Sequence, residues 1–300
     1  MQESLLASPV TKDPLFRSIE ETHEKVRKRY GVILDAGTGG HSLKWLSSLP
    51  AVDRIVAVSA DLSAGEGKGA RELRSILRTD RGDALVEGSW CVGQEPKVGP
   101  GKCCDTILCD YLIGSMDGFT PFAQDMIFGE LATKLKTGGL LHVVGLGPVY
   151  ARLGTKGYFG LTEEQKLVVD VARTRDACIL LAGHRTYREY PVDWVARQLT
   201  RSGFELLDEP KQFGVLWKHA TIKTQLNVAR RKLDLFRDEA LATAMRNKLD
   251  TLDDKAKRLL GDTGVSYGHD YVLSATLRDD NDEETTIAPE DGLQEEEKKN

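Results

Sequence analysis

Residues 32–43 constrain the fold of this chain more than any other stretch. The segment opens with Val-Ile-Leu, three apolar residues typical of a strand buried on both faces of a sheet. Asp35 follows, and then Gly37 and Gly39, which tolerate positive φ angles and a close approach of a ligand to the backbone. Ser42 opens an amphipathic helical stretch. This order predicts a nucleotide-binding turn in an α/β sheet, because unpaired N–H groups point out of such a turn.

The spacing of the glycines separates two kinds of nucleotide. The dinucleotide pattern G-x-G-x-x-G requires glycine at position 42, where this chain has serine. A carboxylate at Asp35 would repel a pyrophosphate, but it would attract the ammonium and sulfonium groups of S-adenosylmethionine. The pattern Asp35-x-Gly37-x-Gly39 resembles the first motif of the class I S-adenosylmethionine-dependent methyltransferases, although many members have glycine at the position of His41. The resemblance implies that this turn holds the cofactor, S-adenosyl-L-methionine, through Asp35, Gly37, Thr38, Gly39 and His41.

A second motif supports the same family. A predicted helix at 126–135 leads into Lys136-Thr137-Gly138-Gly139 and then an apolar strand, which resembles the family's fifth-strand motif. The resemblance implies an α/β fold with a doubly wound, seven-stranded, mostly parallel Rossmann-like sheet. Apolar runs predict its strands at 54–58, 84–87, 105–109, 140–144, 204–217 (broken by Pro210) and 271–277, after the first strand at 32–34.

Further cofactor contacts are expected after the second and third strands. Asp61 lies about twenty residues beyond the glycines, where an acid binds ribose hydroxyls, and it also fits as the N-cap of the next helix. Leu62 is expected beside it. The resemblance implies a group near the third strand that holds the adenine amino group. Asp83 before that strand, or Ser89 and Trp90 after it, are the candidates, with Trp90 alternatively in the core.

The methyl acceptor is expected at the end of the fourth strand, where the fold of this family places the transferable methyl group. Asp110 and Tyr111 close that strand. Asp110 is a candidate both for a cofactor contact and for orienting an amine or taking a proton from a hydroxyl, and the phenol of Tyr111 could hydrogen-bond to either. The alternative is that Asp110 only caps the following turn. Residues 115–122 are expected to form a pocket-lining loop.

Two long insertions, at about 146–190 and 218–268, follow strands five and six. Ligands bind at the carboxyl ends of strands in open α/β sheets, so these insertions are predicted to form a helical lid over the acceptor site. Helices are expected from Thr162 onward and over 221–260, with a restart at Thr251. The candidate acceptor contacts on the roofed side are His184 and His269 as catalytic residues, with Tyr187, Glu189, Tyr190 and His219 near them, whereas His142 is expected in the core.

Composition narrows the class of protein. Residues 279–300 hold 10 acids and 2 lysines, a charge of −8, so that a total of −5 leaves +3 for the rest. The expected organisation is therefore one domain over 1–278 and an acidic, disordered tail. The near-neutral body makes nucleic acid an unexpected partner, and no apolar run predicts a membrane span. Five cysteines without a C-x-x-C pair predict no disulfide framework and no metal site. With no targeting pattern at the N-terminus, a cytoplasmic location is expected.

These observations predict an S-adenosylmethionine-dependent methyltransferase that acts on the O, N or S atom of a small molecule in a roofed pocket. Two alternatives stay open, namely a protein or RNA methyltransferase and a non-catalytic S-adenosylmethionine-binding subunit. The sequence leaves the acceptor and the oligomeric state open.

Overall fold

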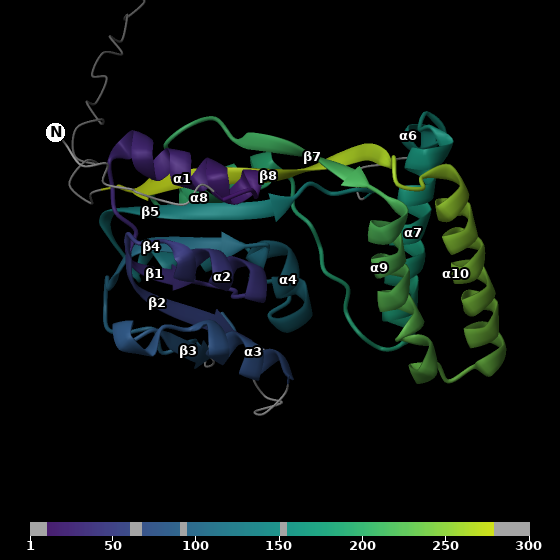
Figure 1. Cartoon of the computed structure of the whole chain (residues 1–300), viewed down its shortest axis with the longest axis horizontal. Coiled ribbons are helices and arrows are strands. Elements are labelled where there is room, and N and C mark those ends of the chain that lie inside the picture. The colour runs from purple at the N-terminus through teal and green to yellow at the C-terminus, as the bar shows by residue number, and fades with distance from the viewer. Residues whose placement is uncertain (1–10, 61–67, 91–94, 151–154, 279–300) are drawn as a thin grey trace, which may run out of the picture.

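A single mixed sheet organises the chain. The computed structural model describes residues 11–60, 68–90, 95–150 and 155–278 (Figure 1). The strand order is β3-β2-β1-β4-β5-β8-β6, and all neighbours up to β5 are parallel, whereas β8 runs antiparallel between β5 and β6. The seven-stranded, mostly parallel fold class predicted from the sequence is confirmed. The strands are β1 (Gly31–Asp35), β2 (Val52–Ser59), β3 (Ala84–Glu87), β4 (Cys104–Asp110), β5 (Leu135–Leu146), β6 (Phe204–Leu206), β7 (Lys211–Trp217) and β8 (Val265–Leu277).

The predicted break of the 204–217 strand at Pro210 is confirmed. It divides this segment into two strands, β6 and β7, which pair with different parts of β8. β6 pairs with the last residues of β8, and β7 pairs with the same strand over 265–272. Pro210 lies between them because proline has no N–H to donate to a strand ladder. β7 therefore lies beside the part of β8 that extends toward the helical insertions.

Helices cover both faces of the sheet because neighbouring residues of each buried strand point to opposite sides. Ile33 belongs to the core under α1, α2 and α3, and Leu34 belongs to the core under α4, α5 and α8. This doubly wound arrangement places the loops after β1 to β4 at one common edge of the sheet. The helices are α1 (Pro14–Val26), α2 (Gly40–Ser48) and α3 (Lys68–Ile76) on one face, and α4 (Leu112–Phe119), α5 (Ile127–Ala132) and α8 (Val192–Arg201) on the other.

Three helices from the two insertions form a unit with a core of its own. They are α7 (Glu163–Leu181), α9 (His219–Arg230) and α10 (Glu239–Leu259), with the short helices α6 (Thr155–Phe159) and η2 (Leu233–Leu235) beside them, and η1 (Thr79–Arg81) lies elsewhere, before β3. Leu167, Leu226 and Leu252 pack together inside this unit. Figure 1 shows α7, α9 and α10 side by side, beyond the end of the sheet at which α4 lies. None of the described helices, including the 21-residue α10, combines the length and apolar character that a membrane span needs.

Two predictions about helices are wrong. Residues 115–122 were expected to form a loop, but α4 covers 112–119. The helix over 221–260 breaks at 231–238 and not at Thr251, because Asp238 caps α10 by accepting a hydrogen bond from the Leu241 N–H. The start of α7 is as predicted, since Thr162 and Gln165 form a reciprocal capping box.

Candidate functional site

A cavity of about 480 Å³ lies where β1, β2, β3 and β4 end. Its size is in the range of small-molecule and cofactor sites. One half is made by the loops after the strands, and the other half by α4 and the segment that precedes α8. The strand-end half is lined by Ala36, Gly37 and Thr38 after β1, Val58, Ser59 and Ala60 at the end of β2, Gly88, Ser89 and Trp90 after β3, and Asp110 and Tyr111 after β4.

Asp35 lies directly behind this lining. Its side chain is fully buried, and its Oδ2 accepts hydrogen bonds from Thr38 Oγ1 at 2.7 Å and Ser42 Oγ at 3.0 Å. Its Oδ1 has no partner among the described residues. Burial raises the pKa of Asp35 to about 7, against the hydrogen bond from Thr38 and with the negative charge of Asp110. Asp35, the acid of the first motif, is thus a buried carboxyl group whose negative charge is not neutralised by any cation among the described residues.

The backbone of the glycine turn faces the cavity at Gly37. A Cβ atom there would lie 2.8 Å from Leu112 Cδ1, so the first turn of α4 leaves no room for a side chain. The indole Nε1 of Trp90 donates a hydrogen bond to the Ala36 carbonyl at 2.6 Å, which ties the loop after β3 to the turn after β1. Trp90 is therefore both in the core and on the cavity wall, as the two interpretations of this residue allowed.

Asp110 and Tyr111 occupy the junction between the two halves. Burial raises the pKa of Asp110 to about 6; His41 opposes the rise, and Asp13 and Asp270 add to it. Burial, with the negative charge of Asp270, raises the pKa of the Tyr111 hydroxyl. Tyr111 has a φ of +49°, in the left-handed region that side-chain-bearing residues seldom adopt. Such strain persists where the surrounding structure holds it, and it is frequent at functional sites.

The electrostatic character of the cavity follows from its lining. No lysine, arginine or histidine is among the residues that line it in the described chain, whereas Asp110 and Glu189 are. A buried carboxylate without a cation is costly, which is why these carboxyl groups hold protons more tightly than usual. The cavity therefore favours a cationic ligand.

Solved structures with the same architecture identify the fold. A candidate methyltransferase from Bacillus halodurans C-125 matches 83% of this chain and 93% of its own at 16% identity, with a TM-score of 0.51. The YcgJ protein from Bacillus subtilis matches 88% and 99% at 15% identity, also with a TM-score of 0.51. The chain has the fold of the class I S-adenosylmethionine-dependent methyltransferases. At the level of sequence, no protein-family model and no curated protein matches it.

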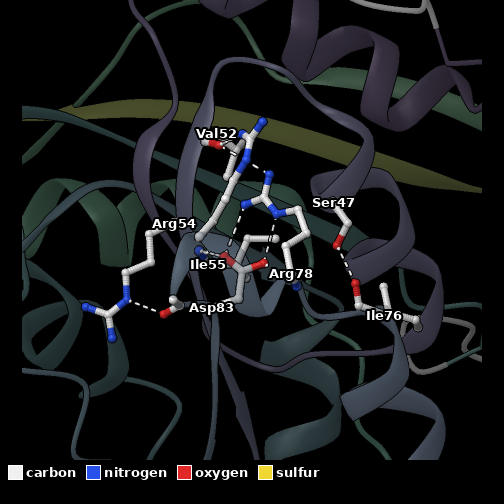
Figure 2. A network of polar contacts seen from close by, with 9 residues as sticks. Ser47, Val52, Arg54, Ile55, Ile76, Arg78 and Asp83 are labelled. Carbon is white, nitrogen blue, oxygen red and sulfur yellow. Dashed lines mark hydrogen bonds and ion pairs between the residues drawn. The ribbon is translucent and has the colours of Figure 1, made fainter.

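Within this methyltransferase fold, Asp83 lies at the wrong edge of the sheet for a cofactor contact. It precedes β3, and five residues of strand at about 3.3 Å each place it roughly 16 Å from Gly88. Its carboxylate accepts two hydrogen bonds from the Arg78 guanidinium, at 2.9 and 3.1 Å, and one from the Ile55 N–H at 2.8 Å (Figure 2). The prediction for Asp83 is corrected accordingly, because this acid joins β2 and β3 at their amino ends.

The candidate histidines do not line the cavity. His184 lies at the end of α7, exposed, with its Nδ1 2.8 Å from Lys232 Nζ. His269 lies in β8 and packs against Gly147, and His219 pairs with Asp253 in the helical unit. His41 is exposed and contacts Asp13 Oδ2 at 2.8 Å. His142 is fully buried, as predicted, and contacts His23 and Ser274.

The remaining predicted residues divide into three groups. Gly39 is the N-cap of α2, and its N–H donates to Ser42 Oγ at 3.2 Å, outside the cavity lining. Asp61 and Leu62 lie outside the described residues. From the predicted roof, Tyr187 and Glu189 line the cavity, whereas no residue of α9 or α10 does. Residues 115–122 were expected to line a pocket from a loop. Ser115, Met116 and Phe119 do line the cavity, but from the helix α4, and Thr120 lines it from the C-cap of that helix.

Proposed function

We propose that this chain is an S-adenosylmethionine-dependent methyltransferase whose acceptor is a small molecule that reacts through O, N or S. One observation carries the proposal: the glycine turn after β1 and the Asp110–Tyr111 pair after β4 line the same cavity. Ligands of open α/β sheets bind at this edge, and a single cavity lets a cofactor and an acceptor meet there.

The residues present fit S-adenosylmethionine better than a dinucleotide. Asp35 Oδ1 is a buried carboxylate oxygen without a partner among the described residues, and Asp110 adds a second acid on the cavity wall. An ammonium and a sulfonium would neutralise this charge, whereas a pyrophosphate would meet two carboxylates and no cation from the part of the lining that the structure describes. The turn at 36–38 would hold the cofactor with the ends of β2 and β3, from Ser59 to Trp90.

The chemistry asked of the chain is modest. S-adenosylmethionine, when bound, supplies a methyl group already activated by the positive sulfur. Asp110 and Tyr111, which line this cavity, would orient the acceptor, and Asp110 would take the proton of an acceptor that is a hydroxyl. Tyr187 and Glu189 would cover the acceptor half and exclude water, which suits a small acceptor better than a folded macromolecule.

Ligand binding tests the cofactor. S-adenosylhomocysteine at a hundred times its Kd is expected to stabilise the full chain by about 2.7 kcal/mol, measured by thermal unfolding, and NAD is expected to have no effect. Gly37→Val should abolish this shift, since the added side chain meets Leu112 and closes the turn. Gly129→Val is the matched control, because Gly129 is exposed on α5 with nothing within 4 Å of its Cβ position. A shift with NAD and none with S-adenosylhomocysteine would overturn the proposal.

Methyl transfer separates the alternatives. The chain is incubated with methyl-labelled S-adenosylmethionine and, separately, with a metabolite extract, a protein fraction and an RNA fraction. Label in the metabolite extract supports a small-molecule acceptor, and label in protein or RNA supports the macromolecular alternative. Cofactor binding without label in any fraction would favour a non-catalytic binding subunit.

A further inference from the structure

Residues 184–191, here called the strap, cross the acceptor half of the cavity between α7 and α8. The strap is fixed to α4 at two points, Arg185 and Arg188. The Arg188 N–H donates to the Gly114 carbonyl at 3.1 Å, and Arg185 Nε donates to the Asp117 carbonyl at 2.8 Å. The Arg185 guanidinium also pairs with the buried Asp117 carboxylate at 3.4 Å. These contacts fix the position of the strap, so that it forms a wall of the cavity.

Two glycines of α4 make room for the side chains of the strap. Gly114 and Gly118 are four residues apart and so lie on one face of the helix. A Cβ at Gly114 would lie 2.5 Å from Glu189 Oε2, and one at Gly118 would lie 3.1 Å from the Tyr187 ring. The Glu189 carboxylate is therefore seated directly on the α4 backbone, at a depth that any larger residue at position 114 would prevent.

Glu189 has no cation bound to it among the described residues, and no hydrogen bond or ion pair joins its carboxylate to any of them. Arg175, whose charge lowers the pKa of Glu189, is itself paired with Asp176 at 2.7 Å and hydrogen-bonded to Gln225 at 2.5 Å. The other charges that act on Glu189 are Asp176 on α7 and Asp270 on β8, both acids. Burial, with these acids, raises the pKa of Glu189 to about 7. When it is ionised, Glu189 therefore carries a negative charge that no bound cation among the described residues neutralises.

A second cavity, of about 430 Å³, lies on the other side of Glu189. Tyr187 and Glu189 line both cavities, so these two side chains form the partition between them. The wall of the second cavity is largely apolar and aromatic, with the paired Arg175 and Asp176 at one side and the exposed Arg188 at another. Its apolar lining includes Leu146, Val149, Ala172, Tyr190, Pro191 and Trp217.

We propose that Glu189 binds the ammonium group of an amine whose apolar or aromatic body lies in the second cavity, and that this amine is the methyl acceptor. The binding site stands on the two cavities and their shared carboxylate, whereas its role as acceptor site rests on the proposed methyltransferase function. A neutral or anionic ligand would leave the Glu189 charge unpaired, and an anion would be repelled by it. The amine is the ligand class that matches both the charge at the partition and the apolar wall behind it.

The same carboxylate can prepare the amine for reaction. The ammonium N–H bond breaks, an O–H bond forms on Glu189, and the nitrogen keeps the electron pair as a neutral amine. The proton leaves to water when the product departs. A carboxyl group that titrates near neutral pH is suited to accept and release this proton, since proton transfer is efficient when the pKa lies near the working pH.

Binding without cofactor tests the proposal on the full chain. The probes are butylamine, phenethylamine and tryptamine, with phenethyl alcohol and phenylacetate as neutral and anionic controls of similar shape. Calorimetry at pH 8 is expected to show binding of the amines only. Glu189→Gln should weaken amine binding by about 10- to 100-fold, the factor expected for loss of a hydrogen bond between charged groups. Glu205→Gln is the matched control, because Glu205 is exposed on β6 and lines neither cavity.

A second pair of variants tests where the body of the amine lies. Ala172→Phe and Thr186→Phe, at two residues that line the second cavity, would fill it and should weaken the binding of tryptamine more than that of butylamine. Glu189→Gln should also raise the Tm of the unliganded chain, because it removes an uncompensated buried charge, whereas a structural ion pair at Glu189 would make the same variant less stable.

Each outcome decides the proposal. Equal binding of the alcohol or the carboxylate, retention of amine binding in Glu189→Gln, or no binding of any amine to the wild-type chain would overturn it. Failure of amine binding with S-adenosylhomocysteine binding intact removes only this inference. Amine binding without S-adenosylhomocysteine binding retains the amine site and removes the proposed methyltransferase function.

Discussion

The two edges of the sheet treat buried acids in opposite ways. At the amino edge, the Asp83 side chain has no exposed surface and is held by both arms of the Arg78 guanidinium. Burial alone would raise its pKa, but the hydrogen bonds from Arg78 and the Ile55 N–H keep the pKa of Asp83 below its usual value. At the carboxyl edge, Asp35 is equally buried, no cation among the described residues pairs with it, and burial raises its pKa to about 7.

This difference separates an acid that stabilises the fold from acids that are available to bind a ligand. Asp83 is charged and satisfied by residues of the same sheet, so its charge contributes to stability. Asp110 and Glu189 line one cavity, and Asp35 lies behind its wall. Burial raises the pKa of all three acids, and no lysine or arginine is among the described residues that line the cavity. An acid whose charge is left uncompensated at one edge of a sheet, when the same sheet compensates another acid fully, points to a cationic ligand.

The largest expected effect is on stability at the amino edge. Asp83→Ala should lower the free energy of unfolding by about 3 kcal/mol, because it leaves the largely buried Arg78 without its partner. Asp53→Ala is the control, since the Asp53–Arg29 pair is exposed and should contribute less than about 1 kcal/mol. Urea unfolding of both variants measures the difference. Equal losses in the two would mean that the paired acid at this edge is not a structural element.

The second prediction moves to the carboxyl edge, where loss of an acid should spare the fold and reduce turnover. Asp110→Asn is expected to lower methyl transfer by about 100-fold, the usual effect of losing a proton-transfer group, and Tyr111→Phe is expected to lower it by removing a hydrogen bond to the acceptor. Both variants should bind S-adenosylhomocysteine within a few-fold of wild type, because the altered groups are expected to act on the acceptor. Initial rates and calorimetry check this pair of outcomes. Turnover near that of wild type in both variants would remove these residues from the acceptor site.

Local pattern in the sequence accounts for most of the sheet and for the glycine turn. Val-Ile-Leu before Asp35 predicts β1 because a strand covered on both faces must be apolar throughout. The helix α4 was missed because Gly114, Asp117 and Gly118 interrupt its apolar period. Those glycines are explained by the strap, which lies about seventy residues further along the chain, so no local signal could have shown their purpose.

Position along a strand explains the other errors. Asp83 and Ser89 flank the same short strand, and only the parallel register of β2 and β3 decides that Ser89 faces the cavity and Asp83 does not. His184 and His269 were expected on the roof because both insertions leave the same edge of the sheet. The three-helix unit instead packs around its own core, and of the described residues in the two insertions only Tyr187 and Glu189 of the strap line the cavity.

The third prediction sharpens the comparison, because removing an uncompensated acid should stabilise the fold. Asp35→Asn keeps an acceptor oxygen for Thr38 and Ser42 but removes the charge. A carboxyl group with a raised pKa holds its proton in the folded state, so its stabilising effect is present below pH 4 and is lost as pH rises toward 7. The free energy of unfolding of Asp35→Asn should therefore match that of wild type near pH 4 and exceed it at pH 8 by at least about 1.4 kcal/mol, the value of one pKa unit. Urea unfolding at both pH values is the measurement, and a less stable variant at pH 8 would mean that the Asp35 charge stabilises the fold.

The smallest expected effect is on the pH dependence of ligand binding, and it tests the meaning of the uncompensated charge directly. If Asp35 must be ionised to bind an ammonium, the Kd of S-adenosylhomocysteine should fall as pH rises and level off near the pKa of about 7. One proton released on binding corresponds to a tenfold change in Kd per pH unit, so the gain between pH 5.5 and 7.5 should be about tenfold or more. Calorimetry in two buffers of different ionisation enthalpy counts the released protons. Asp83 is ionised and distant from the cavity, so Asp83→Asn should keep the wild-type slope of log Kd against pH. Asp35→Asn should remove this slope. A wild-type Kd that does not change with pH would mean that Asp35 does not bind the ammonium of the ligand. The difference in pKa between Asp83 and Asp35 would then reflect packing alone.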